Sequence, residues 1–184
     1  MNVKASAIKL AIELDKYKYG NKIFEKLLDD LNEKDRKIVS SSLLDTSWVP
    51  LEVFAYYLES AVKIIYNGDE SKLVKDVEEA SEKHLRGIYH VFVKLGSPEF
   101  IVKRTVAAAK TYYQGIEATA KITGPKQALL TFTGYKKEHR IIELSILGWI
   151  KCALRLSGAK NIKCDVVRSL ANDKGYFELT TTWT

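Results

Sequence analysis

Four aromatic side chains have the types and spacing that could hold a small molecule: Tyr112, Tyr113, Phe132 and Trp149. Tyr and Trp combine a large apolar surface with one polar atom, and small-molecule sites are built mostly from such groups. Their positions predict that they meet where a helix, the hairpin after it and a later helix come together. Two interpretations are open, because these residues either line an apolar ligand pocket or belong to an ordinary core.

Patterns typical of enzymes and metal sites are missing from the sequence. It has no Gly-rich phosphate loop, no Gly-x-Ser-x-Gly elbow and no His-Glu-x-x-His. Cys152 and Cys164 are too few for a disulfide framework and do not form a close metal-binding pair. Both lie among apolar positions, so we expect reduced, buried thiols. The sequence predicts a non-enzymatic protein with no catalytic residue, no metal site and no cofactor.

The charge is unevenly distributed along the chain. The net charge is +6, and the part after residue 92 carries 15 Lys and Arg against 7 Asp and Glu. These cations are scattered and form no dense run, which is typical of a solvated surface. The chain also lacks a recognition-helix motif, so we expect no nucleic-acid partner. Whether the basic half contacts an acidic partner stays open.

The N-terminal residues indicate no export signal. Lys4, Lys9, Glu13 and Asp15 interrupt the apolar run that a signal peptide or a membrane span needs. Together with the low cysteine count, this predicts a cytoplasmic protein without a membrane span.

The first 115 residues follow the spacing of helices that bury one face. We expect helices over about residues 3–17, 21–31, 33–39, 51–65, 71–95 and 98–113. A corner joins the last two helices. Gly96 can take the left-handed conformation that ends a helix, Ser97 can cap the next one, and Pro98 suits its first position. Glu99 then places negative charge where the helix dipole favours it.

The period changes from helix to strand after Gly115. Alternating apolar residues predict strands over about residues 116–122, 128–133, 162–166 and 177–183, and helical spacing returns over 138–156 and ends at Gly158. This predicts an α+β fold, with an N-terminal helical region packed on a four-stranded antiparallel sheet of β-β-α-β-β order. We expect one domain over residues 1–184, mainly helical over 1–115 and β-β-α-β-β over 116–184.

Four segments carry a resemblance to a known family. They are Tyr19-Gly20, Ser47-Trp48-Val49-Pro50, Arg86-Gly87-Ile88-Tyr89 running into Gly96-Ser97-Pro98-Glu99-Phe100, and Gly148-Trp149 leading to Ser157-Gly158-Ala159. Over nearly its whole length the chain resembles an uncharacterised bacterial domain family expanded in myxobacteria. That family is similar in fold to the 4-vinyl reductase domain, the haem-nitric-oxide-binding domain and subunits of the Golgi transport tethering complex. The resemblance implies a ligand held between helices and a curved antiparallel sheet, used for sensing or assembly.

The chain departs from these relatives at their cofactor and metal positions. Haem-binding relatives supply an axial histidine from the helix before the first strand and a Tyr-x-Ser-x-Arg set. In this chain, residues 98–113 contain no histidine and residues 129–140 contain no such set. Some relatives similar to the vinyl reductase carry paired cysteines near the C-terminal hairpin, where this chain keeps Cys164 alone. We therefore expect neither haem nor a metal ion.

Two function hypotheses follow from the sequence and the resemblance. The first is a non-enzymatic sensor or signalling module that holds a small hydrophobic molecule or lipid in an apolar pocket between helices and sheet. The alternative is a dimeric interaction or assembly module without a ligand. It would use an exposed apolar stripe on the helix after Pro50, formed by Phe54, Tyr56, Tyr57 and Tyr66.

Overall fold

The computed structural model describes residues 1–86, 97–172 and 175–184. Its helices are α1 (Ala5–Tyr19), α2 (Asn21–Asp30), α3 (Glu33–Val39), α4 (Leu51–Ile64), α5 (Glu70–Arg86), α7 (Pro98–Tyr112) and α8 (Ile142–Leu156), with short 3-10 turns η1 (Lys137–His139) and η2 (Leu170–Asn172). Each predicted helix is confirmed over the described residues. The continuation of the fifth helix to Leu95 and the turn at Gly96 lie outside them.

The main sheet has the predicted strands and order. It contains β4 (Glu117–Gly124), β5 (Gln127–Thr133), β6 (Lys163–Arg168) and β7 (Tyr176–Thr182), all antiparallel, in the spatial order β4-β5-β7-β6. Ala118 pairs with Phe132, which pairs with Phe177, so the alternating apolar residues share one face. The α+β fold with β-β-α-β-β order is thus confirmed.

A second, small sheet was not predicted. Strand β1 (Asn2–Lys4) lies between β2 (Trp48–Pro50) and β3 (Tyr113–Gln114). Strands of two or three residues are too short to show a period of two, so the pattern predicts residues 3 and 4 as part of the first helix. Val3 and Val49 pair across this sheet and are almost fully buried. The small sheet joins the start of α1, the start of α4 and the end of α7.

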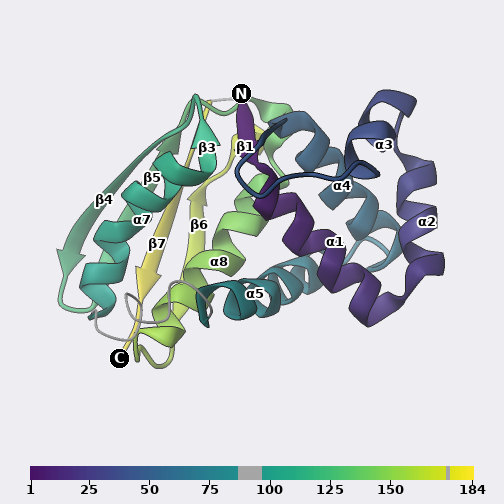
Figure 1. Ribbon diagram of the computed structural model, residues 1–184. Coiled ribbons are helices and arrows are strands. Elements are labelled where there is room, and N and C mark those ends of the chain that lie inside the picture. Colours follow the sequence, from purple (N-terminus) through teal and green to yellow (C-terminus); the bar gives the residue numbers. More distant parts are fainter. Residues whose placement is uncertain (87–96, 173–174) are drawn as a thin grey trace.

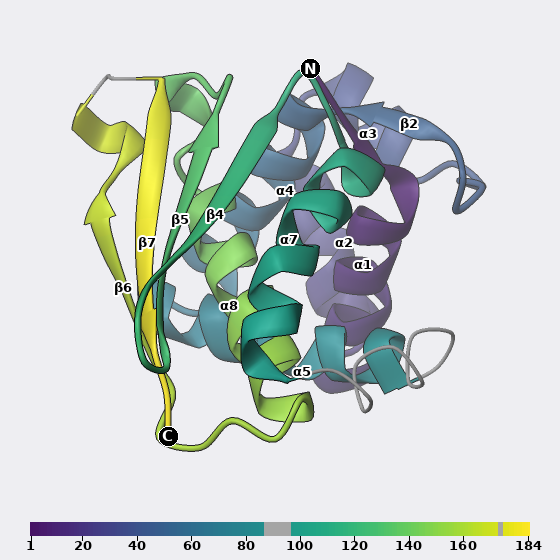
Figure 2. The same cartoon turned by 90° about the vertical axis from the view of Figure 1, so that its left-hand side faces the viewer.

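The elements form successive layers. Figures 1 and 2 show the four-stranded sheet at one side, with α7 and α8 against one of its faces, and α1, α4 and α5 beyond these two helices. Helices α2 and α3 lie farthest from the sheet. One cluster of buried apolar side chains runs from the sheet through α8 to α1, α2 and α4. A cavity lies between the helices and the sheet within these layers.

Helices α5 and α8 approach each other closely at Gly148. A Cβ placed on this glycine would lie 2.7 Å from the Val74 carbonyl oxygen and 2.9 Å from the Val77 Cβ. Real Cβ atoms do not come so near to a backbone oxygen, so the contact requires glycine. Gly148 is in the interior of α8, where glycine is otherwise unfavourable, and close packing is the physical reason for it.

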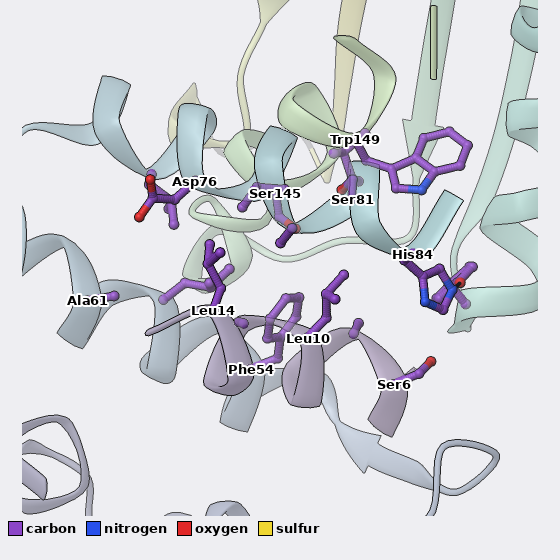
Figure 3. Close-up of a pocket in the computed structure, with 18 of the residues that line it drawn as sticks. Ser6, Leu10, Leu14, Phe54, Ala61, Asp76, Ser81, His84, Ser145 and Trp149 are labelled. Atoms are coloured by element: carbon purple, nitrogen blue, oxygen red, sulfur yellow. Dashed lines mark hydrogen bonds between the residues drawn. The ribbon is translucent and has the colours of Figure 1, made fainter. Parts of the chain in front are cut away.

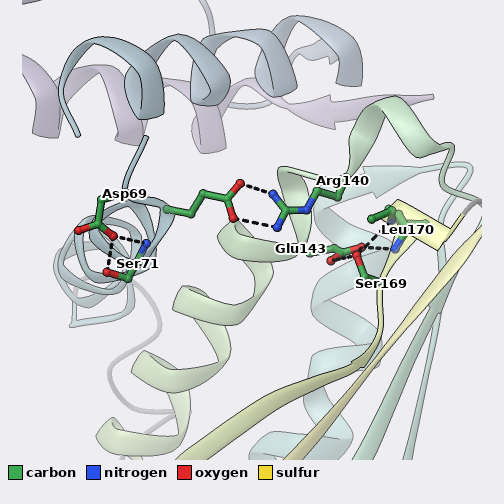
Figure 4. A network of polar contacts seen from close by, with 8 residues as sticks. Asp69, Ser71, Arg140, Glu143, Ser169 and Leu170 are labelled. Atoms are coloured by element: carbon green, nitrogen blue, oxygen red, sulfur yellow. Dashed lines mark hydrogen bonds and ion pairs between the residues drawn. The ribbon is translucent and has the colours of Figure 1, made fainter. Parts of the chain in front are cut away.

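Polar groups tie the start of α5 to α8 and to the end of the sheet (Figure 4). The Arg140 guanidinium forms a two-bond ion pair with the Glu70 carboxylate. The buried Glu143 carboxylate accepts from the Ser169 hydroxyl at 2.9 Å and from the backbone N–H of Leu170. These contacts are charge-assisted, and they fix where α8 begins relative to α5 and η2.

Local capping follows the sequence expectation where it is described. The Ser97 hydroxyl accepts from the Phe100 N–H at 3.3 Å, and Pro98 opens α7. Gly158 has a φ of 95° just after α8, which is the left-handed conformation that glycine adopts readily. No helix in the described part of the chain is long and apolar enough to cross a membrane.

The expected exposed stripe on α4 is wrong. Phe54, Tyr57 and Tyr66 are 3%, 0% and 3% exposed, and only Tyr56 reaches the surface at 40%. Residues of α4 contact α2 on one side and α5 on another, so the helix is buried around most of its circumference. An apolar stripe in the sequence cannot distinguish a helix inside the molecule from one that binds a partner.

Candidate functional site: an apolar cavity between the helices and the sheet

A cavity of about 110 Å³ lies between the helices and the sheet. Its walls come from α1, α4, α5, α7 and α8, with β5 of the sheet. Most of the lining is apolar and includes Leu10, Leu14, Phe54, Leu58, Leu73 and Ile146. Figure 3 shows Leu10, Leu14 and Phe54 along the middle of this space.

All four aromatic residues singled out in the sequence line this cavity. Tyr112 and Tyr113 stand at the end of α7, Phe132 comes from β5 and Trp149 from α8. Phe132 also stacks on Phe177 with ring centroids 4.7 Å apart, so it belongs to the core as well. The structure therefore brings the four side chains to one space, and their role in binding a ligand stays a prediction.

Small side chains on α7 leave this space open. Thr105, Ala108 and Ala109 line the cavity on the side of α7, where larger residues would fill it. The Thr105 hydroxyl donates to the Ile101 carbonyl oxygen at 3.2 Å, so its polar atom is satisfied within the helix. These three residues therefore make this part of the cavity wall mainly apolar.

One end of the cavity carries a polar pair next to an indole. His84 Nε2 and the Tyr112 hydroxyl oxygen are 2.7 Å apart and hydrogen-bonded. Figure 3 places His84 and Trp149 toward the same end, and Asp76 with Ala61 toward the opposite end. The cavity is thus an apolar space with polar groups at both ends.

Asp76 is a carboxylate with several donors. Lys18 Nζ lies 2.7 Å from its Oδ1, and the hydroxyls of Tyr19 and Tyr66 each lie 2.7 Å from its Oδ2. The same ammonium also contacts Glu79 at 2.8 Å. Asp76 is therefore a buried charge that is paired and hydrogen-bonded, as such groups must be.

Asp15 is a second buried carboxylate that lines the cavity. It has fewer hydrogen-bond donors than Asp76 and no direct ion pair among the described residues. It is 4% exposed, and the Tyr57 hydroxyl donates to its Oδ2 at 2.8 Å. Burial raises the pKa of Asp15 to about 7, and the negative charge of Asp76 acts in the same direction. The Tyr57 hydrogen bond and the charge of Lys18 lower this pKa and offset only part of the increase.

The charge around the cavity is acidic. Among the described residues that line it, Asp15 and Asp76 are the charged ones, and no Lys or Arg side chain is present. Lys18 is not a lining residue, and its ammonium contacts both Asp76 and Glu79. The cavity is thus electrostatically suited to a cation or a neutral molecule, and unsuited to an anion.

Sequence reasoning missed Asp15, Asp76 and His84. A signal for both carboxylates was present, since Asp15 follows Ala11 and Ile12 at helical spacing and Asp76 lies between Leu73 and Ala80 on the apolar stripe of α5. A charged residue on a buried helix face requires compensation and is often functional. His84 carried the same signal, since it follows Ala80 by four residues on this stripe, but its contact with Tyr112, 28 positions away, could not be predicted from spacing.

Cys152, Cys164 and His139 are not among the residues that line the cavity. Burial raises the pKa of both Cys152 and Cys164 to about 12, so these thiols stay protonated near neutral pH. His139 is fully buried, and its Nδ1 accepts from the Lys136 N–H at 3.2 Å. Over residues 1–86, 97–172 and 175–184, no three His, Cys, Asp or Glu side chains are grouped so as to hold a metal ion.

No protein-family model and no curated protein sequence matches the chain. Membership of the bacterial family expanded in myxobacteria, which four sequence segments indicate, therefore stays a prediction.

Solved structures, in contrast, share the fold over nearly the whole length. An H-NOX protein from S. oneidensis in the Fe(II)NO ligation state superposes with a TM-score of 0.75 at 9% identity, covering 98% of this chain and 99% of its own. An unliganded Fe(II) H-NOX mutant from K. algicida superposes with a TM-score of 0.74 at 10% identity, covering 98% of this chain and 96% of its own. A mutant of T. tengcongensis H-NOX superposes with a TM-score of 0.66 at 11% identity, covering 98% of this chain and 97% of its own. At this identity the likeness shows that the chain has the fold of H-NOX proteins.

Proposed function

We propose that this protein is a non-enzymatic sensor module that holds a small apolar molecule in the cavity between its helices and its sheet. The observation that carries the proposal is the cavity of about 110 Å³, walled mainly by apolar side chains and bounded by a few polar groups. Such an arrangement is typical of small-molecule sites. The H-NOX fold supports the proposal as an analogy, because those proteins are described with ligands on their iron.

The volume of the cavity limits the size of the ligand. Pockets that enclose drug-sized molecules measure roughly 300–1,000 Å³, whereas an engineered cavity of about 150 Å³ takes up benzene. A space of about 110 Å³ suits a single ring or a short chain. A long acyl chain is too large for it. Of the two ligand classes that the sequence suggested, a small hydrophobic molecule is therefore favoured over a lipid.

The residues at the cavity do not fit a haem. The volume is far below that of a porphyrin, and His84 and Tyr112, whose side chains could ligate iron, are hydrogen-bonded to each other. Haem also carries two carboxylates, which in a buried site require cationic partners. The described lining offers Asp15 and Asp76 instead, and these would repel them.

Two further observations support a binding role over the alternatives. The thiols of Cys152 and Cys164 are protonated at neutral pH, and protonated thiols are poor nucleophiles. The alternative of a dimeric interaction module relied on four side chains in and just after α4, of which Phe54, Tyr57 and Tyr66 are buried and only Tyr56 is exposed. Other apolar side chains are exposed on the described surface, among them Tyr17, Leu44 and Val167, but these three lie on separate segments of the chain.

A matched pair of substitutions on α7 tests the proposal. Ala109 lines the cavity and is 5% exposed, while Ala107 lies two residues earlier on the exposed side of the same helix. Ala109→Leu should fill part of the space, and Ala107→Leu should leave it unchanged. Both proteins and the unchanged protein are titrated with ethylbenzene, with binding followed by thermal shift and by methyl NMR.

The proposal expects saturable binding of ethylbenzene by the unchanged protein and by Ala107→Leu, and binding weakened about tenfold or more in Ala109→Leu. The melting temperature of each protein without ligand shows whether it is folded. Equal binding by all three proteins, or no binding by any of them, would contradict the proposal.

A further inference from the structure

Within the described part of the chain, one oxygen of Asp15 has no hydrogen-bond donor, whereas both oxygens of Asp76, the other buried carboxylate of the cavity, have one. Among the described residues, the Tyr57 hydroxyl is its hydrogen-bond donor, and this reaches Oδ2. A carboxylate oxygen pair can accept about four hydrogen bonds. Oδ1 of Asp15, a residue that is only 4% exposed and lines the cavity, is therefore open to a donor from a ligand.

The charge near Asp15 also favours a cationic donor. Asp76 faces Asp15 from α5 and raises its pKa, and the nearby ammonium of Lys18 is engaged by Asp76 and Glu79. Tyr57 on α4 contributes a neutral hydroxyl. Three carboxylates thus share one ammonium at this side of the cavity, so an additional positive charge would be stabilised there.

We propose that the ligand of the cavity is a small primary amine, whose ammonium binds Asp15 and whose apolar body lies against Leu14, Phe54 and Leu58. The inference rests on the proposed function and names the chemical class of ligand for the same site. An ammonium can donate to Oδ1 and replace the water that burial removes from this carboxylate. An apolar ligand of equal size would leave Oδ1 unpaired.

The protonation state of Asp15 links amine binding to pH. Because burial raises the pKa of Asp15 to about 7, its carboxyl group is partly protonated at neutral pH when no cation is near. Lys18 on α1 and Tyr57 on α4 lower this pKa, and Asp76 on α5 raises it. An amine binds the ionised form, so its affinity should increase as the pH rises from 6 to 8. A neutral ligand should show no such increase.

Three probes of similar size and different charge test the inference: benzylamine, ethylbenzene and benzoate. Their affinities for the full chain are measured by calorimetry at pH 6, 7 and 8. A hydrogen bond to a charged group corresponds to about tenfold or more in affinity, so benzylamine should bind at least that much more tightly than ethylbenzene at pH 8. Benzoate should bind most weakly.

Two variants separate the role of Asp15 from a general effect of charge. Asp15→Asn keeps an acceptor for the Tyr57 hydroxyl and removes the charge, so the preference for benzylamine and its pH dependence should both disappear. Asp29→Asn removes a charge at an exposed position on α2, where the side chain is 65% accessible, and should change neither. If Asp15→Asn does not fold, the pH dependence of the unchanged protein still decides the question.

The outcomes distinguish this inference from the proposed function. Ethylbenzene binding that Ala109→Leu weakens, together with benzylamine binding that is no tighter and independent of pH, would support the cavity as a ligand site and overturn the amine assignment. Failure of all three probes would overturn both. A preference for benzylamine that survives Asp15→Asn would also overturn the assignment, because the ammonium would then lie elsewhere.

Discussion

At the scale of single residues, Asp15 makes the folded state sensitive to pH. Its pKa is about 7 in the folded protein and near its ordinary value of 3.8 when unfolded, so the folded state binds the proton more tightly. The stability that this proton contributes is present below pH 4 and is lost as the pH rises through 7. A shift of about three units corresponds to at most on the order of 4 kcal/mol.

We predict that Asp15→Asn removes this pH dependence. Asn keeps an oxygen to accept from Tyr57 and carries no charge, so the variant should gain stability relative to the unchanged protein as the pH rises from 5 to 8. Urea unfolding at several pH values measures the difference, with Asp29→Asn as the exposed control. A constant difference between the two proteins across this range would show that Asp15 does not titrate with a raised pKa.

Residue types reveal a site only in part. Tyr112, Tyr113, Phe132 and Trp149 could be found because large aromatic residues stand near expected junctions of elements, and all four line the cavity. Asp15 stood out only as a charge that interrupts an apolar run. Its surroundings depend on α5, which packs on α1, and on Tyr57 of α4, and a sequence pattern in α1 alone does not contain those contacts.

At the scale of elements, periodicity predicted what is long and regular. The helices and the four strands of the main sheet were predicted to within a few residues over the described chain, because each repeats its period several times. The strands β1, β2 and β3 were missed, since pairing between distant segments defines them. The exposed face of α4 was also wrong, because the number of neighbours around a helix is a tertiary property.

Gly148 provides a prediction at this scale. Gly→Ala in the interior of a helix normally stabilises a protein by roughly 0.5–1 kcal/mol. Here the added Cβ would meet the Val74 carbonyl oxygen at 2.7 Å, and a backbone atom cannot move aside without displacing α5. We expect Gly148→Ala to destabilise the protein by about 1–3 kcal/mol, as overpacked sites do.

Urea unfolding of Gly148→Ala measures this effect, and Lys151→Ala on the same helix is the control for propensity alone. Lys151 is only partly buried and should change stability by less than about 0.5 kcal/mol. A Gly148→Ala protein as stable as the unchanged one would mean that α5 and α8 are farther apart than the structure shows. The same variant should alter ligand binding, because Val77 and Trp149 near this contact line the cavity.

At the scale of the whole molecule, one fold accommodates different site chemistry. The chain superposes on H-NOX structures over 98% of its length at 9–11% identity, so the layers of helix and sheet are shared while most side chains differ. In this chain the space between the layers is small, apolar and acidic. Under the proposed function, the fold would determine where a ligand lies, and the side chains on α1, α5 and α7 would determine which ligand is accepted.

The last prediction concerns haem and follows from size and charge together. Added to the purified full chain, haemin should give no stoichiometric Soret band, because the cavity is too small and its carboxylates Asp15 and Asp76 oppose the carboxylates of haem. His84→Ala is the matched variant, since His84 is the histidine among the lining residues. A one-to-one Soret band that His84→Ala abolishes would contradict the prediction and show that His84 leaves Tyr112 to ligate iron. Weak absorbance that is equal in both proteins would indicate surface binding, and the cavity would then remain available to a small amine.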